Sequence, residues 1–493
     1  MTVKTIFVYY NDNKKYFLNW DSDVDVVKTP LANDKYNRIF YTENGVLRVT
    51  DKDLLPLDPN NALTVDPLYS LLPCPPVPTL NPEASGTAYG VDETLKETRG
   101  YVYTFVNKYG QEGPPSEVSD LIDIYDGNNV TVGNMDTSVD SSYAVDTKRI
   151  YRINQSAGEN GQFQFVAEIN LTQPTYEDFI FDSGLGEIIP DSWEAAPTGI
   201  NGLISLPNQV LAGFIGNIVC FSYPKYPHAW PVVYQKILDK NVVGLGSYGT
   251  TVIALTEGQP YVIVGDNPAS SVAEKIEIGH SCVSKKGIVD INGITVYPGP
   301  EGLVGIGSKG SDLLTYELMT QKQWSEYNPS SIEAYYWENK YVAFYSTLDK
   351  KAGFIFDPKT KDFIDLDRQN DTYSFFYATA GYHDQIDGTL YLQFGDEIDA
   401  FNKGISYRWM QYKSKRYKTK PWCPGVIKVI AKTYPVLIDI IYPEIPVTIV
   451  ASVTSENPLR IPPFFVDTVE IRPYGNTEIT AIYLASTFEE LPI

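Results

Sequence analysis

Alternation of apolar and polar residues with a period of two dominates this chain, and helical periodicity is scarce. Strand–turn–strand units recur, each pairing β-branched and aromatic runs across Gly, Asn or Asp, which is the chemistry of β-hairpins. The first unit reads NRIFYTENGVLRVT (37–50), with Asn44-Gly45 at its turn. The others are VLAGFIGNIVCFS (210–222), TVIALTEGQPYVIVG (251–265), GIVDINGITVYPGPEGLVGIG (287–307), YYWENKYVAFYS (335–346), KAGFIFD (351–357) and GTLYLQFGDEIDAF (388–401). The pattern predicts an all-β protein.

Two segments test that interpretation. SDLLTYELMTQKQ (Ser311–Gln323) is the best helical stretch, with Ser311 as its N-cap. The most apolar C-terminal segment, residues 436–453, is interrupted by acidic residues and prolines, whereas a membrane helix needs about 20 uninterrupted apolar residues. We therefore expect two strands around a turn there, and no insertion into a membrane.

The spacing of the hairpin turns suggests a repeated unit. Comparable turn points fall roughly 40–50 residues apart, which is the length of a four-stranded propeller blade. They lie near Gly216, Gly258, Gly293, Asn339 and Gly388. No blade signature of the WD type accompanies them. The spacing predicts a β-propeller over residues 196–410, with the β segment of residues 1–90 joining the same ring.

The sequence changes character on both sides of that region. PCPPVPTLNP (73–82) is rich in proline and predicts a stiff, extended linker. Period-2 strands separated by turns then predict an inserted β-sandwich of fibronectin or immunoglobulin type over residues 91–195. A second linker, LGEIIPDSWEAAPTGI (185–200), leads back to the blades. Residues 411–493 are expected to form a small C-terminal β-domain.

Composition adds a charge argument. The chain has 493 residues, 37 of them Tyr, and a formal net charge of −22. Such a surface repels phosphate backbones, which disfavours a clamp on nucleic acid. A conduit through which DNA slides would instead benefit from an acidic wall that does not hold the DNA.

One stretch places scarce reactive side chains close together. NIVCFSYPKYPHAWPVVYQ (217–235) contains Cys220 and His228, in a chain with four Cys and three His. A nucleophile–base pair needs a third group that orients the base, and the local sequence identifies none. Three prolines restrict the backbone around His228, and aromatic residues supply packing area. We interpret the stretch as a proline–aromatic corner, with Cys220 as a small core residue; a reactive pair is the alternative.

Other motifs are weaker. His280 and Cys282, in GHSCVSKKG, are expected on the same face of a strand, but zinc needs three or four converging ligands. GLGSYG matches the G-x-G-x-x-G pattern, yet the strand-like TTVIALT follows it where a dinucleotide site needs a helix. The scattered Cys include no C-x-x-C pair, which indicates neither zinc nor a disulfide framework. We assign no catalytic, cofactor-binding or metal residues and expect no enzyme.

The run YKSKRYKTKPW (412–422) is the clearest local reversal of charge. Its alternation predicts a strand with one solvated face. The alternatives are an electrostatic contact with an acidic neighbouring subunit or with DNA. Sequons begin at Asn129, Asn154 and Asn170, and without a secretory signal we expect ordinary turn and strand residues there.

Extended phrases of the chain resemble the tail nozzle, or tail tubular protein B-like, family of podovirus-type bacteriophages. The main run is GLISLPNQVLAGFIGNIVCFSYPKYPHAWP (202–231), continued by VVGLGSYGTTVIALTEGQPYVIVGDNPASS and CVSKKGIVDINGITVYPGPEGLV. Upstream, YVYTFVNKYGQEGPPSEVS, KRIYR, FVAEI and LGEIIPDSW are similar to the same proteins. The likeness spans residues 99–345. It implies a propeller with added β-sandwich domains that assembles as a ring, six copies in the podovirus nozzle, below the portal and adaptor.

The resemblance implies a structural virion protein, a nozzle or hub subunit in the phage tail that forms part of the DNA ejection conduit after synthesis in the host cytoplasm. Its expected partners are copies of itself in a ring, the tail adaptor and tail fibres. DNA is expected only as the transiting genome in an acidic lumen, and no cofactor is expected. The alternative is a tail-associated receptor-binding or glycan-processing propeller, because aromatic residues stack on sugar rings. A cellular propeller scaffold unrelated to phage is a third hypothesis.

Overall fold

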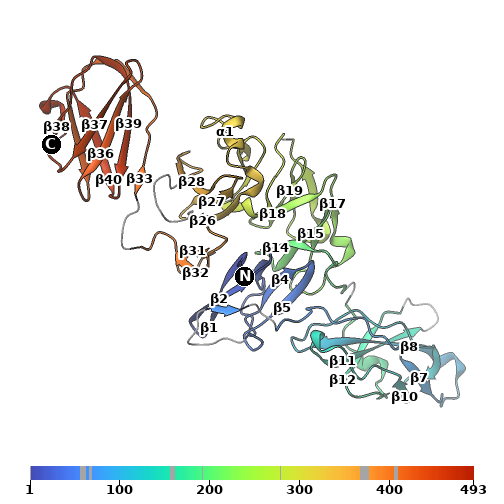
Figure 1. The fold of residues 1–493 in the computed structure, drawn as a ribbon. Helices are drawn as coiled ribbons and strands as arrows, with labels where there is room; N and C mark the ends of the chain where they lie inside the picture. Colours follow the sequence, from blue (N-terminus) through green and yellow to red (C-terminus); the bar gives the residue numbers. More distant parts are fainter. Residues whose placement is uncertain are drawn as a thin grey trace. The chain divides into compact units, whose positions relative to one another are not determined.

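The computed structural model describes residues 2–55, 63–65, 69–155, 161–190, 193–277, 279–366, 377–404 and 409–492 (Figure 1). The chain divides into two compact units, Met1–Asp399 and Ala400–Ile493. Strands make up nearly all of the elements, so the predicted all-β class is confirmed. The helical elements are α1 (Gln321–Ser325) and the 3-10 turns η1 (Glu93–Leu95), η2 (Ser141–Tyr143), η3 (Asp182–Gly184), η4 (Val232–Tyr234), η5 (Pro268–Ser270), η6 (Lys285–Gly287), η7 (Pro329–Ser331) and η8 (Phe488–Glu490).

Four consecutive four-stranded antiparallel sheets form the largest part of the first unit, and in each of them strand order follows chain order. The first two are β14 (Asn201–Leu206), β15 (Val210–Ile215), β16 (Ile218–Phe221) and β17 (Lys236–Ile237), then β18 (Val242–Tyr248), β19 (Thr251–Thr256), β20 (Tyr261–Val264) and β21 (Val272–Lys275). The next two are β22 (Val289–Ile291), β23 (Ile294–Pro298), β24 (Leu303–Gly307) and β25 (Gly310–Leu313), then β26 (Glu333–Trp337), β27 (Lys340–Ser346), β28 (Lys351–Phe356) and β29 (Phe363–Asp365).

Three-stranded sheets precede and follow this series. Before it come β1 (Thr5–Asn11) and β2 (Lys14–Trp20) with β6 (Leu63–Val65), and the sheet of β3 (Asp25–Lys28), β4 (Ile39–Glu43) and β5 (Val46–Thr50). After it come β30 (Ala380–Asp384), β31 (Thr389–Phe394) and β32 (Glu397–Ala400).

The contacts between these seven sheets form a closed series. The strands β3, β14, β18, β22, β26 and β30 touch one another in that order, and β30 touches β1. The sheet of β1 and β2 in turn shares a core with the sheet of β3–β5. In Figure 1, β4 and β5 (blue) lie beside β14 (green) although about 150 residues separate them in the sequence. The two ends of this part of the chain therefore meet.

Adjacent sheets pack face to face through alternating apolar residues. Val210 and Ala212 of β15 share a core with Val252 and Ala254 of β19. Trp324 of α1 is fully buried in the core between the sheets of β22–β25 and β26–β29. Apolar side chains at every second strand position thus join these neighbouring sheets.

The predicted hairpin turns are confirmed where their backbone can be checked. Asn44 and Gly45 have φ of 51° and 75°, and Glu338 and Asn339 have φ of 45° and 62°. Positive φ at both central residues is the type I′ geometry that suits the twist of paired strands. The apolar C-terminal segment likewise forms two strands around a turn, as predicted.

The predicted helix over Ser311–Gln323 is wrong for most of its length. Ser311 lies in β25, which pairs with β24, so sheet pairing overrides the local helical pattern. The only α-helix among the described residues is α1, one turn long. Thr320 caps it in a capping box with Gln323.

A pair of antiparallel sheets lies between the first strands and β14. One contains β7 (Glu83–Gly86), β10 (Val130–Gly133) and β13 (Tyr176–Asp178). The other contains β8 (Lys96–Asn107), β9 (Ile122–Tyr125), β11 (Val145–Gln155) and β12 (Gln164–Asn170), in the order β12-β11-β8-β9. Tyr101, Tyr103 and Phe105 of β8 meet Val130 and Val132 of β10 in one core. We call this part the sandwich; its first strand begins before residue 91.

The proline-rich stretch before the sandwich is packed against its neighbours. Cys74 is 4% exposed, and its Sγ contacts the carbonyl of Trp193 at 3.6 Å. The carbonyl of Pro73 accepts a hydrogen bond from Asn107. Residues 191 and 192 of the second expected linker lie outside the described residues.

The second unit contains two sheets around one core. The first contains β33 (Met410–Gln411), β34 (Tyr417–Trp422), β36 (Val436–Tyr442), β37 (Val447–Val453) and β39 (Val466–Gly475). The second contains β35 (Val426–Ala431), β38 (Leu459–Arg460) and β40 (Ile479–Ala485). No helix within the described ranges is long and apolar enough to cross a membrane.

Candidate functional site

A hollow of about 510 Å³ lies between residues of three of these sheets, and several of its lining residues are polar. Strand β22 contributes Asp290, β26 contributes Tyr335 and Tyr336, and β30 contributes Tyr382 and His383. The remaining lining residues are Ile288, Val289, Ala334, Gly381 and Gln385. The rings of Tyr336 and His383 meet edge to face, with centroids 4.6 Å apart. The hollow is therefore walled by aromatic side chains from neighbouring sheets.

Asp290 accepts one hydrogen bond from its own sheet and one from the neighbouring sheet. Its Oδ1 accepts from the Thr295 hydroxyl at 2.5 Å, and its Oδ2 accepts from the backbone N–H of Ser247 at 3.0 Å. Burial raises the pKa of Asp290, although these donors oppose the shift. A Cβ at Gly246 would lie 2.4 Å from Thr295, so that glycine permits the close approach of β18 to β23. Asp290 thus joins two sheets at the rim of the hollow.

A set of ion pairs joins η6 to residues of the neighbouring sheets. Lys285 of η6 lies 3.2 Å from Asp23 and 2.8 Å from Asp25. Burial works against the charged form of Lys285, but Asp25 and Asp23 outweigh it and raise its pKa. Asp25 also accepts the backbone N–H of Gly202 at 2.6 Å. Lys286 pairs with Glu333 at 3.5 Å. This set, which the sequence patterns did not single out, connects η6 with β3, β14 and β26.

Cys220 and His228 are both buried, at 1% exposure each. Cys220 lies in an apolar core with Leu211 and Trp230, and burial raises the pKa of its thiol to about 11. His228 Nε2 lies 3.0 Å from the carbonyl of Glu112, and the ring meets Trp193 edge to face. Burial lowers the pKa of His228 to about 3. A protonated thiol and a neutral imidazole held this way support the interpretation as a packed corner.

The prediction that His280 and Cys282 share a strand face is wrong, because residues 279–284 lie outside any strand. Cys282 is buried in a core with Tyr297, while His280 is half-buried and lies 3.7 Å from Glu301. The Gly-rich match behaves as predicted: Gly244 and Gly246 lie within β18, and Gly249 has φ of +58° at the turn into β19.

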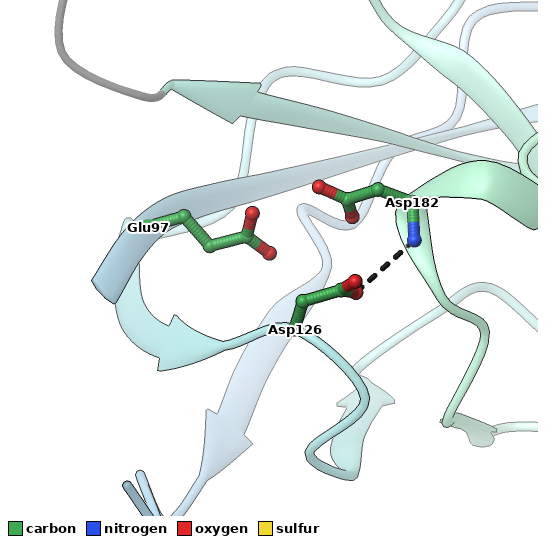
Figure 2. Close-up of side chains that lie close together, drawn as sticks. All are labelled: Glu97, Asp126 and Asp182. Atoms are coloured by element: carbon green, nitrogen blue, oxygen red, sulfur yellow. Dashed lines mark hydrogen bonds between the residues drawn. The ribbon is translucent and has the colours of Figure 1, made fainter. Parts of the chain in front are cut away.

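Three carboxylates approach one another at one end of the sandwich (Figure 2). Glu97 comes from β8, Asp126 follows β9, and Asp182 begins η3. One oxygen of each lies within 4.8 Å of the other two, which is the spacing of cation ligands. In Figure 2 the Asp126 carboxylate accepts the backbone N–H of Asp182, at 3.0 Å.

Arginines already neutralise this cluster. Arg99, fully buried, binds Glu97 and lies 3.1 Å from Asp126 and 3.4 Å from Asp182. Arg152, also fully buried, binds Asp178 and Asp182, each at 2.7 Å. Burial and the neighbouring Asp182 carboxylate raise the pKa of Glu97 to about 7, against the opposing effect of Arg99. Glu97 and Arg99 are buried while Asp126 and Asp182 are exposed, and Arg99 contacts all three carboxylates where a metal ion would have to bind.

The expectation of a strand with one solvated face over residues 412–422 is wrong. Only Tyr417–Trp422 form a strand, β34, and its side chains are exposed on both faces except for the half-buried Trp422. Of the sequon residues Asn129, Asn154 and Asn170, Asn129 precedes β10, and its side chain donates to Glu177 at 2.7 Å. Asn154 and Asn170 lie in β11 and β12.

Comparisons with known proteins assign the chain to no family. No protein-family model matches it, and no curated protein matches it. The extracellular domain of a hybrid two component system from B. thetaiotaomicron is 8% identical over 70% of this chain and 45% of its own, with a TM-score of 0.31. A one component system domain from the same organism is 10% identical over 81% and 52%, with a TM-score of 0.23. The chain spans about half the length of these two. PorZ, an essential surface component of the type-IX secretion system of Porphyromonas gingivalis, is 10% identical over 93% and 82%, with a TM-score of 0.30.

Proposed function

We propose that the seven sheets are the blades of a β-propeller with an inserted fibronectin- or immunoglobulin-like sandwich and a small C-terminal β-domain. The closed series of contacts supports this architecture, because propeller blades are sheets arranged around a central channel. The face-to-face cores between successive sheets support it too. The N-terminal strand β1 then closes the ring against β30, which joins the two ends of the propeller chain.

We further propose that the protein is a structural subunit of a phage tail, a nozzle or hub component of the DNA ejection conduit. The observation that carries this proposal is the extended likeness of residues 99–345 to tail nozzle proteins. The burial of Cys220 and His228 is consistent with a structural role, since the segment that contains them, residues 217–235, forms a packed corner. A conduit subunit needs rigid, mutually braced modules, and the closed series of sheets would provide them.

In this proposal, copies of the chain assemble as a hexameric ring below the portal and adaptor, with tail fibres as further neighbours. The genome passes through the lumen of the ring without being held. The net charge of −22 supports that role, because an acidic wall weakens adhesion of a polyanion. The protein would act in the virion tail, without a cofactor or enzymatic activity.

Electron microscopy of the purified protein, alone and mixed with the candidate adaptor, tests the proposal. A closed ring with a central channel that stacks on the adaptor is the expected result. A protein that stays monomeric at all concentrations and does not bind the adaptor would overturn it.

A receptor-binding or glycan-processing propeller is the second candidate, because the hollow is walled by Tyr335, Tyr336 and Tyr382. Aromatic faces of this kind stack against sugar rings. A glycan array combined with a reducing-sugar release assay separates the two functions. Binding or release that a Tyr336→Ala variant abolishes would favour this candidate over the conduit.

A further inference from the structure

The two compact units differ sharply in charge. Ala400–Ile493 contains 11 Lys and Arg against 8 Asp and Glu, a formal charge of +3, while Met1–Asp399 contains the other 28 and 53, a charge of −25. The positive charge of the second unit is concentrated in one segment without a single acidic residue. We call this segment the basic edge: Lys413, Lys415, Arg416, Lys418 and Lys420.

The basic edge lies along one side of a sheet. The backbone N–H groups of Tyr412 and Ser414 donate to the carbonyls of Pro473 and Ile471 of β39, at 3.0 and 2.9 Å. Strand β34 continues the pairing with β39, and among the described strands neither β33 nor β34 pairs with any other. The outer side of this edge is therefore open to a partner.

All five cations of the basic edge are exposed. Glu470 binds Lys413 and Arg416, and within the described part of the chain Lys415, Lys418 and Lys420 have no carboxylate partner. Two exposed aromatic residues, Tyr412 and Tyr417, alternate with them. Tyr and Arg are enriched at surfaces that bind another protein.

The sandwich carries a segment of opposite charge. No Lys or Arg occurs between Lys108 and Lys148. Within this stretch, three carboxylates occur at every third residue. The first two precede β9 and the third lies in it, and β9 is an edge strand of the sheet β12-β11-β8-β9. We call this segment the acidic edge: Glu117, Asp120 and Asp123.

The acidic edge is also held along a strand and exposed on its outer side. The backbone N–H groups of Ser116 and Ser119 donate to the carbonyls of Tyr103 and Tyr101 of β8, both at 2.9 Å. Val118 and Leu121 between the carboxylates are 46% and 60% exposed. No ion pair to any of the three carboxylates occurs among the described residues.

The two edges match in length as well as charge. At about 3.3 Å per residue, the basic edge extends over roughly 23 Å and the acidic edge over roughly 20 Å. Each presents charges beside exposed apolar or aromatic side chains. We propose that the basic edge of one copy binds the acidic edge of a second copy, in a head-to-tail contact that closes a ring. The inference rests on the proposed function, since it names the contact by which copies assemble.

A protein partner fits the basic edge better than DNA does. Glu470 neutralises part of its charge, and the chain as a whole carries −22, which opposes the approach of a phosphate backbone. An acidic protein edge with exposed apolar residues complements both the cations and the tyrosines.

Two charge reversals in the full chain test the contact. Variant one is Lys415→Glu with Lys418→Glu, and variant two is Glu117→Lys with Asp120→Lys. Alone, variant one lowers the formal charge of the basic edge from +5 to +1, and variant two changes that of the acidic edge from −3 to +1, so we expect self-association at least roughly 100-fold weaker than in the wild type, measured by analytical ultracentrifugation. Mixed 1:1, the two glutamates introduced in variant one face the two lysines introduced in variant two, and part of the assembly should return. The wild-type assembly should also weaken as NaCl rises.

A control with the same charge change is Lys14→Glu with Lys309→Glu, two exposed lysines outside both edges, which should assemble like the wild type. Circular dichroism and thermal unfolding confirm that every variant folds. Wild-type assembly that neither variant weakens would overturn this inference and leave the proposed ring standing, whereas a monomeric wild type would overturn the ring itself. Absence of rescue on mixing would contradict the copy-to-copy contact. Duplex DNA binding, measured by fluorescence anisotropy, that variant one loses while it still assembles would make the basic edge a nucleic-acid surface instead.

Discussion

The sandwich and the closed series of sheets both hold cations between carboxylates, but they do so in different surroundings. In the sandwich, Arg152 and Asp178 are both fully buried. In the closed series of sheets, Lys285 is 25% exposed and its partners Asp23 and Asp25 are 45% and 17% exposed. The same kind of ion pair is thus removed from water in one region and left partly hydrated in the other.

A second buried cation strengthens the contrast. Lys148 of the sandwich is fully buried, and its ammonium group donates to the carbonyls of Asp136 and Gln173, both at 2.7 Å. Burial lowers the pKa of Lys148 to about 8. Buried charges are costly unless every partner is present, so the sandwich should tolerate the loss of one partner poorly. The pairs near the hollow should tolerate it better, because water can replace part of what is lost.

The largest effect is expected from Arg152→Met. Among the described residues, this change leaves the buried carboxylate of Asp178 with the Tyr101 hydroxyl and the backbone N–H of Ile180 as donors. Loss of one member of a buried pair costs about 3–5 kcal/mol in the free energy of unfolding. Urea unfolding followed by circular dichroism measures it, and the double change with Asp178→Asn should recover part of the loss.

The matched control is Lys96→Met in the same sandwich. Lys96 pairs with Glu93, whose side chain is 80% exposed, at 3.5 Å. An exposed pair contributes about 0–1 kcal/mol, so this variant should unfold close to the wild type. If Arg152→Met behaved like Lys96→Met, the contrast between buried and hydrated pairs would not hold.

A smaller loss, about 1–2 kcal/mol, is expected for Lys285→Met. Asp25 keeps the backbone N–H of Gly202 and the hydroxyl of Thr42 as donors, and its surroundings stay partly hydrated.

The salt dependence of the loss in stability should also differ between the two regions. In 0.5 M NaCl the difference between wild type and Lys285→Met should shrink, while that for Arg152→Met should not, because buried pairs are screened less. Equal salt dependence of the two variants would contradict this comparison.

These ion pairs also mark the limit of what the sequence could predict. The hairpin at Asn44-Gly45 was predictable because a type I′ turn needs positive φ at two adjacent residues, and that requirement is local. The pairing of Arg152 with Asp178 was not predictable from the sequence, because the two residues are 26 positions apart and any of 61 acidic residues is a possible partner. The helix over Ser311–Gln323 failed for a related reason: pairing with β24 is a tertiary contact that local propensity does not contain.

The burial of Cys220 and His228 shows an intermediate case. The prolines and aromatic residues around His228 predicted a packed corner, and both side chains are buried. The hydrogen-bond partner of His228, the carbonyl of Glu112, lies 116 residues away in the chain, and no sequence pattern indicated it. The sequence therefore indicated the kind of environment, and the fold supplied the partner.

The sandwich is also expected to show a pH dependence of its unfolding free energy. The pKa of Glu97 is about 7 in the folded chain, above its ordinary value of 4.5, because of burial and the neighbouring Asp182 carboxylate. The folded state therefore holds this proton more tightly than the unfolded state does. The contribution of Glu97 to stability is fully present below pH 4.5 and is lost as pH rises toward 7.

Glu97→Gln, which cannot lose a proton, should flatten this part of the curve of unfolding free energy against pH. The exposed Glu93→Gln is the control and should keep the wild-type slope between pH 4.5 and 7. A Glu97→Gln curve parallel to the wild type over that range would show that the carboxylate cluster is hydrated like the ion pairs near the hollow, and the two regions would no longer differ in how they treat buried charge.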